Sequence, residues 1–168
     1  GAAGWIALNT IPALRTRLLG RSLLAVGIGG GLTLALATQG VLALDPWYLP
    51  RYVVPLAGMT FANAMTAVSL AAERVQAELA HGDSWIEARN TAYQAAMIPV
   101  INSLLAVGLV SLPGMMTGQI LSGVSPLLAA RYQVLIMCLI FAAAGLAAAL
   151  FLAGARPVLA PRRAEDPG

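Results

Sequence analysis

The sequence has no lysine, a single cysteine, a single histidine and few charges of either sign: charged residues make up 10% of its 168 residues, and all ten basic residues are arginine. Without lysine, a GxxxxGK[ST] loop for nucleotide phosphates cannot occur. Cys138 has no second cysteine to form a disulfide with, and we expect it to be a small buried hydrophobic residue. One cysteine and one histidine, His81, on different segments cannot form a tetrahedral metal site. We therefore expect no enzyme activity and no cofactor in this chain.

What the sequence does contain is long apolar stretches. Hydrophobic residues make up 59% and the mean hydropathy is +0.79, whereas soluble domains have about 45–50% apolar and about 25% charged residues. No formal charge occurs from Asn90 to Ala130, a run too long for the core of a soluble domain of this size. The lipid bilayer is the expected environment, and the net charge of +3 reflects arginines at membrane edges rather than affinity for nucleic acid.

An all-α, polytopic membrane fold with about four transmembrane helices is predicted, forming a single transmembrane domain over residues 1–168. About 20 helical residues cross a bilayer core of roughly 30 Å, and four stretches are long enough or nearly so: 22–44, 53–72, 95–112 and 132–154. Gly27 and Gly31 form a GxxxG pair on the first, for which close helix packing is the favoured interpretation. The uncharged residues before Leu14 are too few to span, and we expect them to be the inner end of a helix that begins upstream.

Most of the charge lies in residues 73–94, where apolar residues recur at helical spacing. Gly82 predicts a turn between two helical arms, and Ser84-Trp85-Ile86-Glu87 has the form of a capping box. This coupling segment either docks a partner or lies as a surface helix at the lipid interface. The second arm is expected to continue into the third span, with a kink near Pro99.

The last uncharged region is interrupted by Pro113 and Gly114, and residues 113–126 are predicted to hold one short helix. Irregular backbone at membrane depth is tolerated where protein or a watery cavity surrounds it. Met115 and Met116 either pack or offer soft sulfur ligands. Similarly, Asn63 and Asn102 either form hydrogen bonds between helices or line a path.

Arginine bias predicts the orientation. If the coupling segment is cytoplasmic, that side collects eight arginines, and the other side keeps Arg51 and Arg131, as the positive-inside rule requires. Both ends of the chain are then cytoplasmic. The eight are Arg15, Arg17, Arg21, Arg74, Arg89, Arg156, Arg162 and Arg163.

Two blocks of sequence resemble the permeases of bacterial iron-export ABC transporters, whose plant relatives are linked to aluminium tolerance. The first is Pro55-Leu56-Ala57-Gly58-Met59 with Asn63-Ala64-Met65. The second runs from Val107 to Gln119 through Leu112-Pro113-Gly114-Met115-Met116, and Pro126 and Tyr132-Gln133 follow it. The resemblance implies further spans upstream, so that N-terminal spans are missing from this chain.

The same resemblance implies a permease subunit in the bacterial inner membrane that exports iron or a related metal ion. A separate cytoplasmic ABC ATPase subunit would bind ATP and Mg²⁺, and a second permease copy would complete a homodimer. The metal ligands stay unknown. The residues expected to dock the ATPase are Glu78, Leu79, His81, Gly82, Trp85 and Arg89. Those expected to line the translocation path are Met59, Asn63, Asn102, Pro113, Gly114, Met115, Met116 and Gln119.

Two other functions fit the same sequence. One is a membrane scaffold that transports nothing and docks some other cytoplasmic protein through the coupling segment. The other is an ABC permease for another cargo, such as a lipid.

Overall fold

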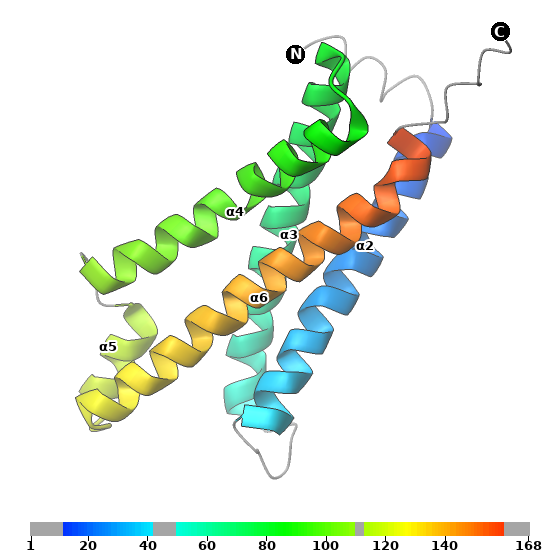
Figure 1. Ribbon diagram of the computed structural model, residues 1–168. Coiled ribbons are helices and arrows are strands. Elements are labelled where there is room, and N and C mark those ends of the chain that lie inside the picture. The colour runs from blue at the N-terminus through cyan, green and yellow to red at the C-terminus, as the bar shows by residue number, and fades with distance from the viewer. Residues whose placement is uncertain (1–11, 42–49, 110–112, 160–168) are drawn as a thin grey trace, which may run out of the picture.

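The computed structural model describes residues 12–41, 50–109 and 113–159, and these form helices joined by short turns (Figure 1). No strand occurs in the described ranges, which confirms the predicted all-α fold. In chain order the elements are α2 (Pro12–Ala35), the π-helical turn η1 (Leu36–Val41), α3 (Pro50–His81), α4 (Trp85–Leu109), α5 (Gly114–Leu121) and α6 (Pro126–Leu159).

Three helical segments in the described residues are long and apolar enough to cross a membrane, so the chain is a multi-pass membrane protein. They are Leu18–Val41, Tyr52–His81 and Pro126–Leu159. The predicted span 95–112 lies in α4 as far as Leu109, and residues 110–112 fall outside the described residues. The fourth crossing therefore stays a prediction.

The helices extend beyond the predicted spans. α2 begins ten residues before Ser22 and runs through the cluster of arginines, and α3 continues past Ala72 to His81. α6 begins at Pro126, a residue suited to a first helical turn, and it continues past residue 154 through Arg156 to Leu159. The helices are longer than the spans because charged residues mark the edge of the hydrocarbon core but do not end a helix. Arginine and glutamate are good helix formers.

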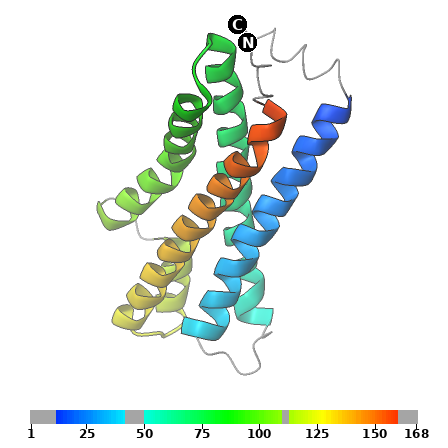
Figure 2. The same cartoon turned by 45° about the vertical axis from the view of Figure 1, so that its right-hand side comes forward.

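In the bundle, α6 lies between α2 and α4 and also packs against α3 (Figure 2). Small side chains dominate the main buried cluster, and they let the helices approach closely. Its alanines are Ala25, Ala64, Ala67, Ala71, Ala88, Ala92, Ala96, Ala144, Ala147, Ala148 and Ala155.

Two glycines of α2 lie at close helix contacts, but they are not the predicted pair. A Cβ added at Gly29 would lie 2.8 Å from the backbone N of Ala147 in α6, and one at Gly30 would lie 2.8 Å from a phenylalanine ring of α3. A Cβ at Gly27 or Gly31 would meet no heavy atom within 4 Å. Close helix packing at this group of glycines is therefore confirmed at Gly29 and Gly30, whereas no described residue contacts the Gly27–Gly31 pair.

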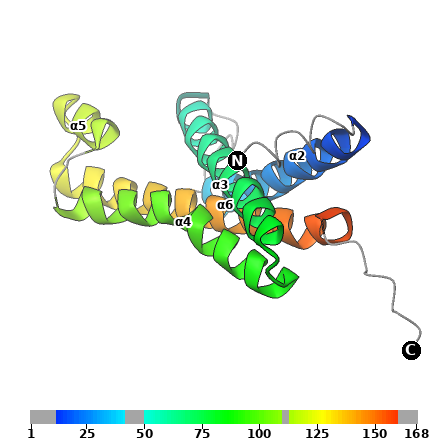
Figure 3. The ribbon, with the colours of Figure 1, turned by 90° about the horizontal axis from the view of Figure 1, so that it is seen from above.

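The start of α2, the turn between α3 and α4, and the end of α6 lie at one end of the bundle (Figure 1). α5 lies at the opposite end, beside the last turns of α4 and the first turns of α6. In the view from above it lies away from α2 (Figure 3). At the first end Nη1 of Arg21 donates a hydrogen bond of 2.6 Å to the carbonyl O of Gly154. The arginines of the described helix ends are thus gathered at that end, except for Arg51 near the start of α3 and Arg131 near the start of α6.

Candidate functional site

The turn between α3 and α4, here called the elbow (residues 78–87), is closed by backbone hydrogen bonds. The N–H of Gly82 donates to the O of Leu79 at 3.2 Å, and the N–H of Asp83 donates to the O of Glu78 at 3.3 Å. This pairing is a Schellman motif. Gly82 has φ of +99°, in the left-handed region that glycine alone adopts without strain. The predicted turn is confirmed.

The first turn of α4 is held by the predicted capping box. The backbone N–H and the hydroxyl of Ser84 both donate to Oε2 of Glu87, at 3.2 and 2.7 Å, and the N–H of Glu87 is 3.4 Å from Oγ of Ser84. These bonds satisfy N–H groups that the start of a helix leaves without a partner. The elbow is thus a short, fixed connection.

The predicted docking residues on the α3 side surround this turn. Glu78 pairs with Arg74 at 2.5 Å, one helical turn earlier. Leu79 packs partly buried against the main cluster. His81 is exposed, and its Nδ1 lies 2.7 Å from the carbonyl O of Ala77, to which it donates. The exposed, polar end of α3 is therefore an ordered surface.

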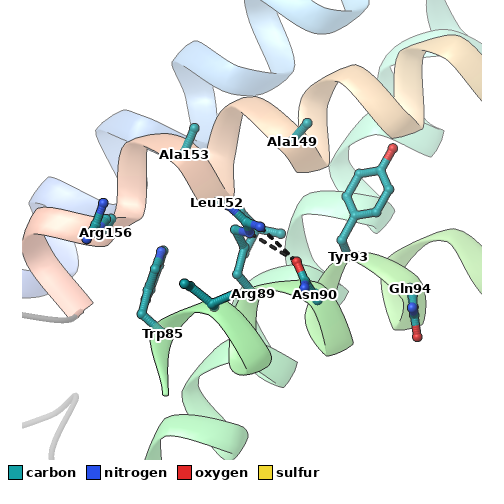
Figure 4. A pocket seen from close by; sticks show the side chains of 10 residues that line it. Trp85, Arg89, Asn90, Tyr93, Gln94, Ala149, Leu152, Ala153 and Arg156 are labelled. Atoms are coloured by element: carbon teal, nitrogen blue, oxygen red, sulfur yellow. Dashed lines mark hydrogen bonds between the residues drawn. The ribbon is translucent and has the colours of Figure 1, made fainter. Parts of the chain in front are cut away.

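The other two predicted docking residues, Trp85 and Arg89, lie on the α4 side and line a groove between α4 and α6 with a volume of about 730 Å³ (Figure 4). Nε and Nη2 of Arg89 donate to Oδ1 of Asn90 at 3.2 and 2.9 Å. The sequence analysis missed the groove, because half of it comes from α6. Its lining is Trp85, Ile86, Arg89, Asn90, Tyr93, Gln94, Ala149, Leu152, Ala153 and Arg156.

The predicted path residues of α3 occupy one face of that helix. Nδ2 of Asn63 donates to the carbonyl O of Met59 at 2.8 Å, so its amide is bonded within α3. Among the described residues this bond runs within one helix, so a hydrogen bond from Asn63 to another helix stays a prediction. Met59 packs against a second buried cluster, formed by Ala37, Leu56, Ile136 and Leu139.

The interrupted segment contains the predicted short helix, α5. Pro113 precedes it, and the half-buried Met115 packs against the same second cluster as Met59. Gly114 is exposed, whereas Met116 and Gln119 are half-buried. The structure therefore brings two predicted path methionines to one cluster, from α3 and from α5.

Asn102 is separated from this group. It lies in α4, which runs through Pro99 as one helix, and it is exposed and belongs to neither buried cluster. Its role in a path stays a prediction.

Metal-ligating side chains are not gathered in the part of the chain that the structure describes, where no three of His, Cys, Asp and Glu come together. Cys138 is exposed on α6, which corrects the expectation that it is buried. Apart from the thiol of Cys138, the donors in the apolar parts of the described spans are neutral oxygens and thioethers.

The family model described as "Uncharacterised protein family (UPF0014)" matches residues 1–159 of this chain. A UPF0014 membrane protein of Synechocystis sp. is 37% identical over 153 residues, which cover 82% of this chain and 59% of the relative.

Two further relatives have more informative names. The "probable iron export permease protein FetB" of Escherichia coli is 34% identical over 140 residues, covering 74% of this chain and 53% of that protein. The Arabidopsis thaliana protein named "ALUMINUM SENSITIVE 3" is 36% identical over 112 residues, covering 58% of this chain and 41% of that protein. The chain thus spans about half the length of the curated relatives that it matches, and no solved structure matches it.

Proposed function

We propose, from the premise that this chain belongs to the UPF0014 family of membrane proteins, that it is part of the permease subunit of an ATP-driven exporter of iron or a related metal ion. The name of the Escherichia coli relative supports permease activity and iron as cargo. The bacterial inner membrane is the proposed location.

The observation that carries the proposal is the unbroken course of α3. Its 32 residues extend over about 48 Å at 1.5 Å per residue, against a bilayer core of roughly 30 Å. The excess lies at the charged end, since the apolar part of α3 begins near Tyr52. One rigid rod therefore joins a membrane crossing to the elbow, so a force applied at the elbow reaches the membrane without an intervening hinge.

In this proposal the elbow faces the cytosol and docks a separate ATPase subunit. Glu78, Leu79, His81 and Gly82 form the contact from α3, and Trp85 and Arg89 flank it from α4. The clustering of arginines at this end supports the orientation by the positive-inside rule. ATP and Mg²⁺ bind the partner, because this chain has no nucleotide-binding loop.

Closure of two ATPase subunits would move the elbows of two permease copies and tilt α3 and α4 as rigid rods. Rigid-body shifts of this kind interconvert the two states of many switching proteins. The methionines at the second cluster, together with Asn63, offer the cargo weak neutral ligands on the way out. Weak ligands suit a transported ion because it must also leave.

The deciding experiment is co-purification of the full-length protein with its ATPase, followed by reconstitution into proteoliposomes. We expect a stable complex whose ATP hydrolysis rises when iron or a related metal ion is added. A complex that forms but responds to a lipid cargo would point to another ABC permease. If no ATPase binds, and a deletion strain keeps its metal sensitivity, the scaffold function is favoured and the exporter is excluded.

A further inference from the structure

The groove between α4 and α6 contains a second arginine, Arg156, that the exporter proposal does not use. Arg89 of α4 and Arg156 of α6 bring two guanidinium groups to it from different helices, and Trp85 and Tyr93 border it (Figure 4). We propose that this groove binds an anionic phospholipid, with the headgroup phosphate held between Arg89 and Arg156. The inference requires only that the protein lies in a membrane, so it stands apart from the proposed function.

The charge in the groove selects an anion. Among the described residues that line it none is Asp or Glu, so the two arginines are not neutralised there. The guanidinium of Arg89 now bonds the amide oxygen of Asn90, a neutral acceptor that a phosphate oxygen can replace. Charge-assisted bonds from a guanidinium fork to phosphate are stronger than the bond they would displace. The amides of Asn90 and Gln94 add uncharged donors.

The position of the groove matches the level of lipid headgroups. It lies at the end of the bundle where α6 finishes and the elbow begins, close to the bond between Arg21 and Gly154. Trp85 and Tyr93 are the residue types that settle at the membrane–water interface. Basic pockets between transmembrane helices at the cytoplasmic surface are sites where anionic headgroups bind.

The apolar lining favours a lipid over an acidic protein segment. Ala149, Leu152 and Ala153 line the α6 side of the groove. Exposed apolar side chains then continue along both helices toward the membrane interior, namely Ile98, Ile101 and Leu105 on α4 and Leu146 and Leu150 on α6. Acyl chains can follow this surface from the headgroup, whereas an acidic peptide would leave it uncovered. A volume of about 730 Å³ is ample for a phosphoglycerol headgroup.

The inner boundary of the groove also depends on a close contact. The hydroxyl O of Tyr93 would lie 3.2 Å from a Cβ at Gly145 of α6. Because Gly145 has no side chain, the Tyr93 ring can reach across from α4 to α6 beside the groove that it lines.

The test is native mass spectrometry of the full-length protein in detergent, titrated with phosphatidylglycerol or phosphatidylcholine. We expect phosphatidylglycerol to bind more tightly, and Arg89→Gln and Arg156→Gln each to weaken it by about fivefold, the usual share of one arginine near an anionic surface. Arg74→Gln is the matched control, because it removes the same charge at the same end but outside the groove. Equal binding of the two lipids, or an equal loss in the control, overturns the proposal.

Two further measurements separate other occupants. Inorganic phosphate or glycerol phosphate at millimolar concentration should not displace the lipid; displacement would make this a site for free phosphate and contradict a lipid site. Arg156→Gln should still co-purify with the ATPase. Loss of the ATPase with unchanged lipid binding would assign the groove to the protein interface instead. Failure of the exporter proposal would leave the lipid titration unchanged.

Discussion

The two turns at opposite ends of the molecule share one backbone design and differ in chemistry. The elbow has the sequence Gly82-Asp83-Ser84, and the apolar turn (residues 119–128) has Gly123-Val124-Ser125. Both glycines have positive φ, +99° and +89°. Each turn is closed as a Schellman motif, in the second case by bonds from Gly123 to Ile120 O and from Val124 to Gln119 O, both 3.0 Å.

The difference lies three residues after each serine. At the elbow that position is Glu87, which completes a capping box; at the apolar turn it is Leu128, whose N–H is 3.4 Å from the hydroxyl of Ser125. The elbow also has the ion pair of Glu78, whereas its counterpart Gln119 is uncharged. The two turns therefore have the same backbone but different surfaces. The turn between α3 and α4 is suited to water and a protein partner, and the turn between α5 and α6 is suited to apolar surroundings.

The largest difference between the turns is expected for proline in place of each glycine. Gly82→Pro and Gly123→Pro remove equivalent N–H donors and force φ to about −65°. If only the elbow transmits ATP-driven motion, Gly82→Pro should reduce metal-stimulated ATP hydrolysis at least tenfold, and Gly123→Pro should leave ATPase co-purification intact. Measured in proteoliposomes, wild-type coupling in Gly82→Pro would remove the elbow from the mechanism.

A charge reversal at the elbow should have the next largest effect. Glu78→Arg breaks the pair with Arg74 and places two positive charges one turn apart, so we expect ATPase binding to weaken about tenfold, the usual scale for a disrupted charge contact at an interface. Glu73→Arg is the matched control, being exposed on the same helix. Binding can be followed by surface plasmon resonance with the ATPase, and equal losses in both variants would indicate a general charge effect rather than a contact.

A substitution in the uncharged part of the molecule should change metal transport and leave ATPase binding unchanged. Asn102→Leu removes an exposed amide of α4 and is expected to change metal flux several-fold while the ATPase still binds. Metal flux is measured into or out of loaded proteoliposomes, and ATPase binding is measured by co-purification. Unchanged flux would show that Asn102 does not line the path.

The smallest effect concerns the caps. Ser84→Ala should lose about 1 kcal/mol of local stability, the usual worth of a capping serine, which is about a fivefold increase in amide exchange at the start of α4. Ser125→Ala should lose less, because both serine hydroxyls accept a 3.4 Å bond from the N–H three residues on, but only the Ser84 hydroxyl also donates to a glutamate. Hydrogen exchange followed by mass spectrometry resolves both peptides, and equal changes would mean that Glu87 adds nothing to the elbow.

Local patterns predicted the turns well because their causes are local. A glycine followed by Ser-x-x-Glu defines both a helix stop and a helix start within ten residues, and Pro113 with Gly123 brackets α5 in the same way. The predicted spans are shorter than the helices, since the sequence shows where lipid contact stops and not where helical hydrogen bonding stops. For Asn63 the sequence left two roles open, and the bond that the structure shows runs to a carbonyl one turn back in the same helix.

The sequence alone determined that this is an all-α, multi-pass membrane protein with a charged elbow, since hydropathy, charge and turn residues act over a few neighbours along the chain. Only the tertiary structure decided that Gly29 and Gly30, not Gly27 and Gly31, contact other described helices, and that Arg89 and Arg156 line one groove. Those facts depend on the rotation of each helix about its own axis, which is set by packing against elements distant in sequence.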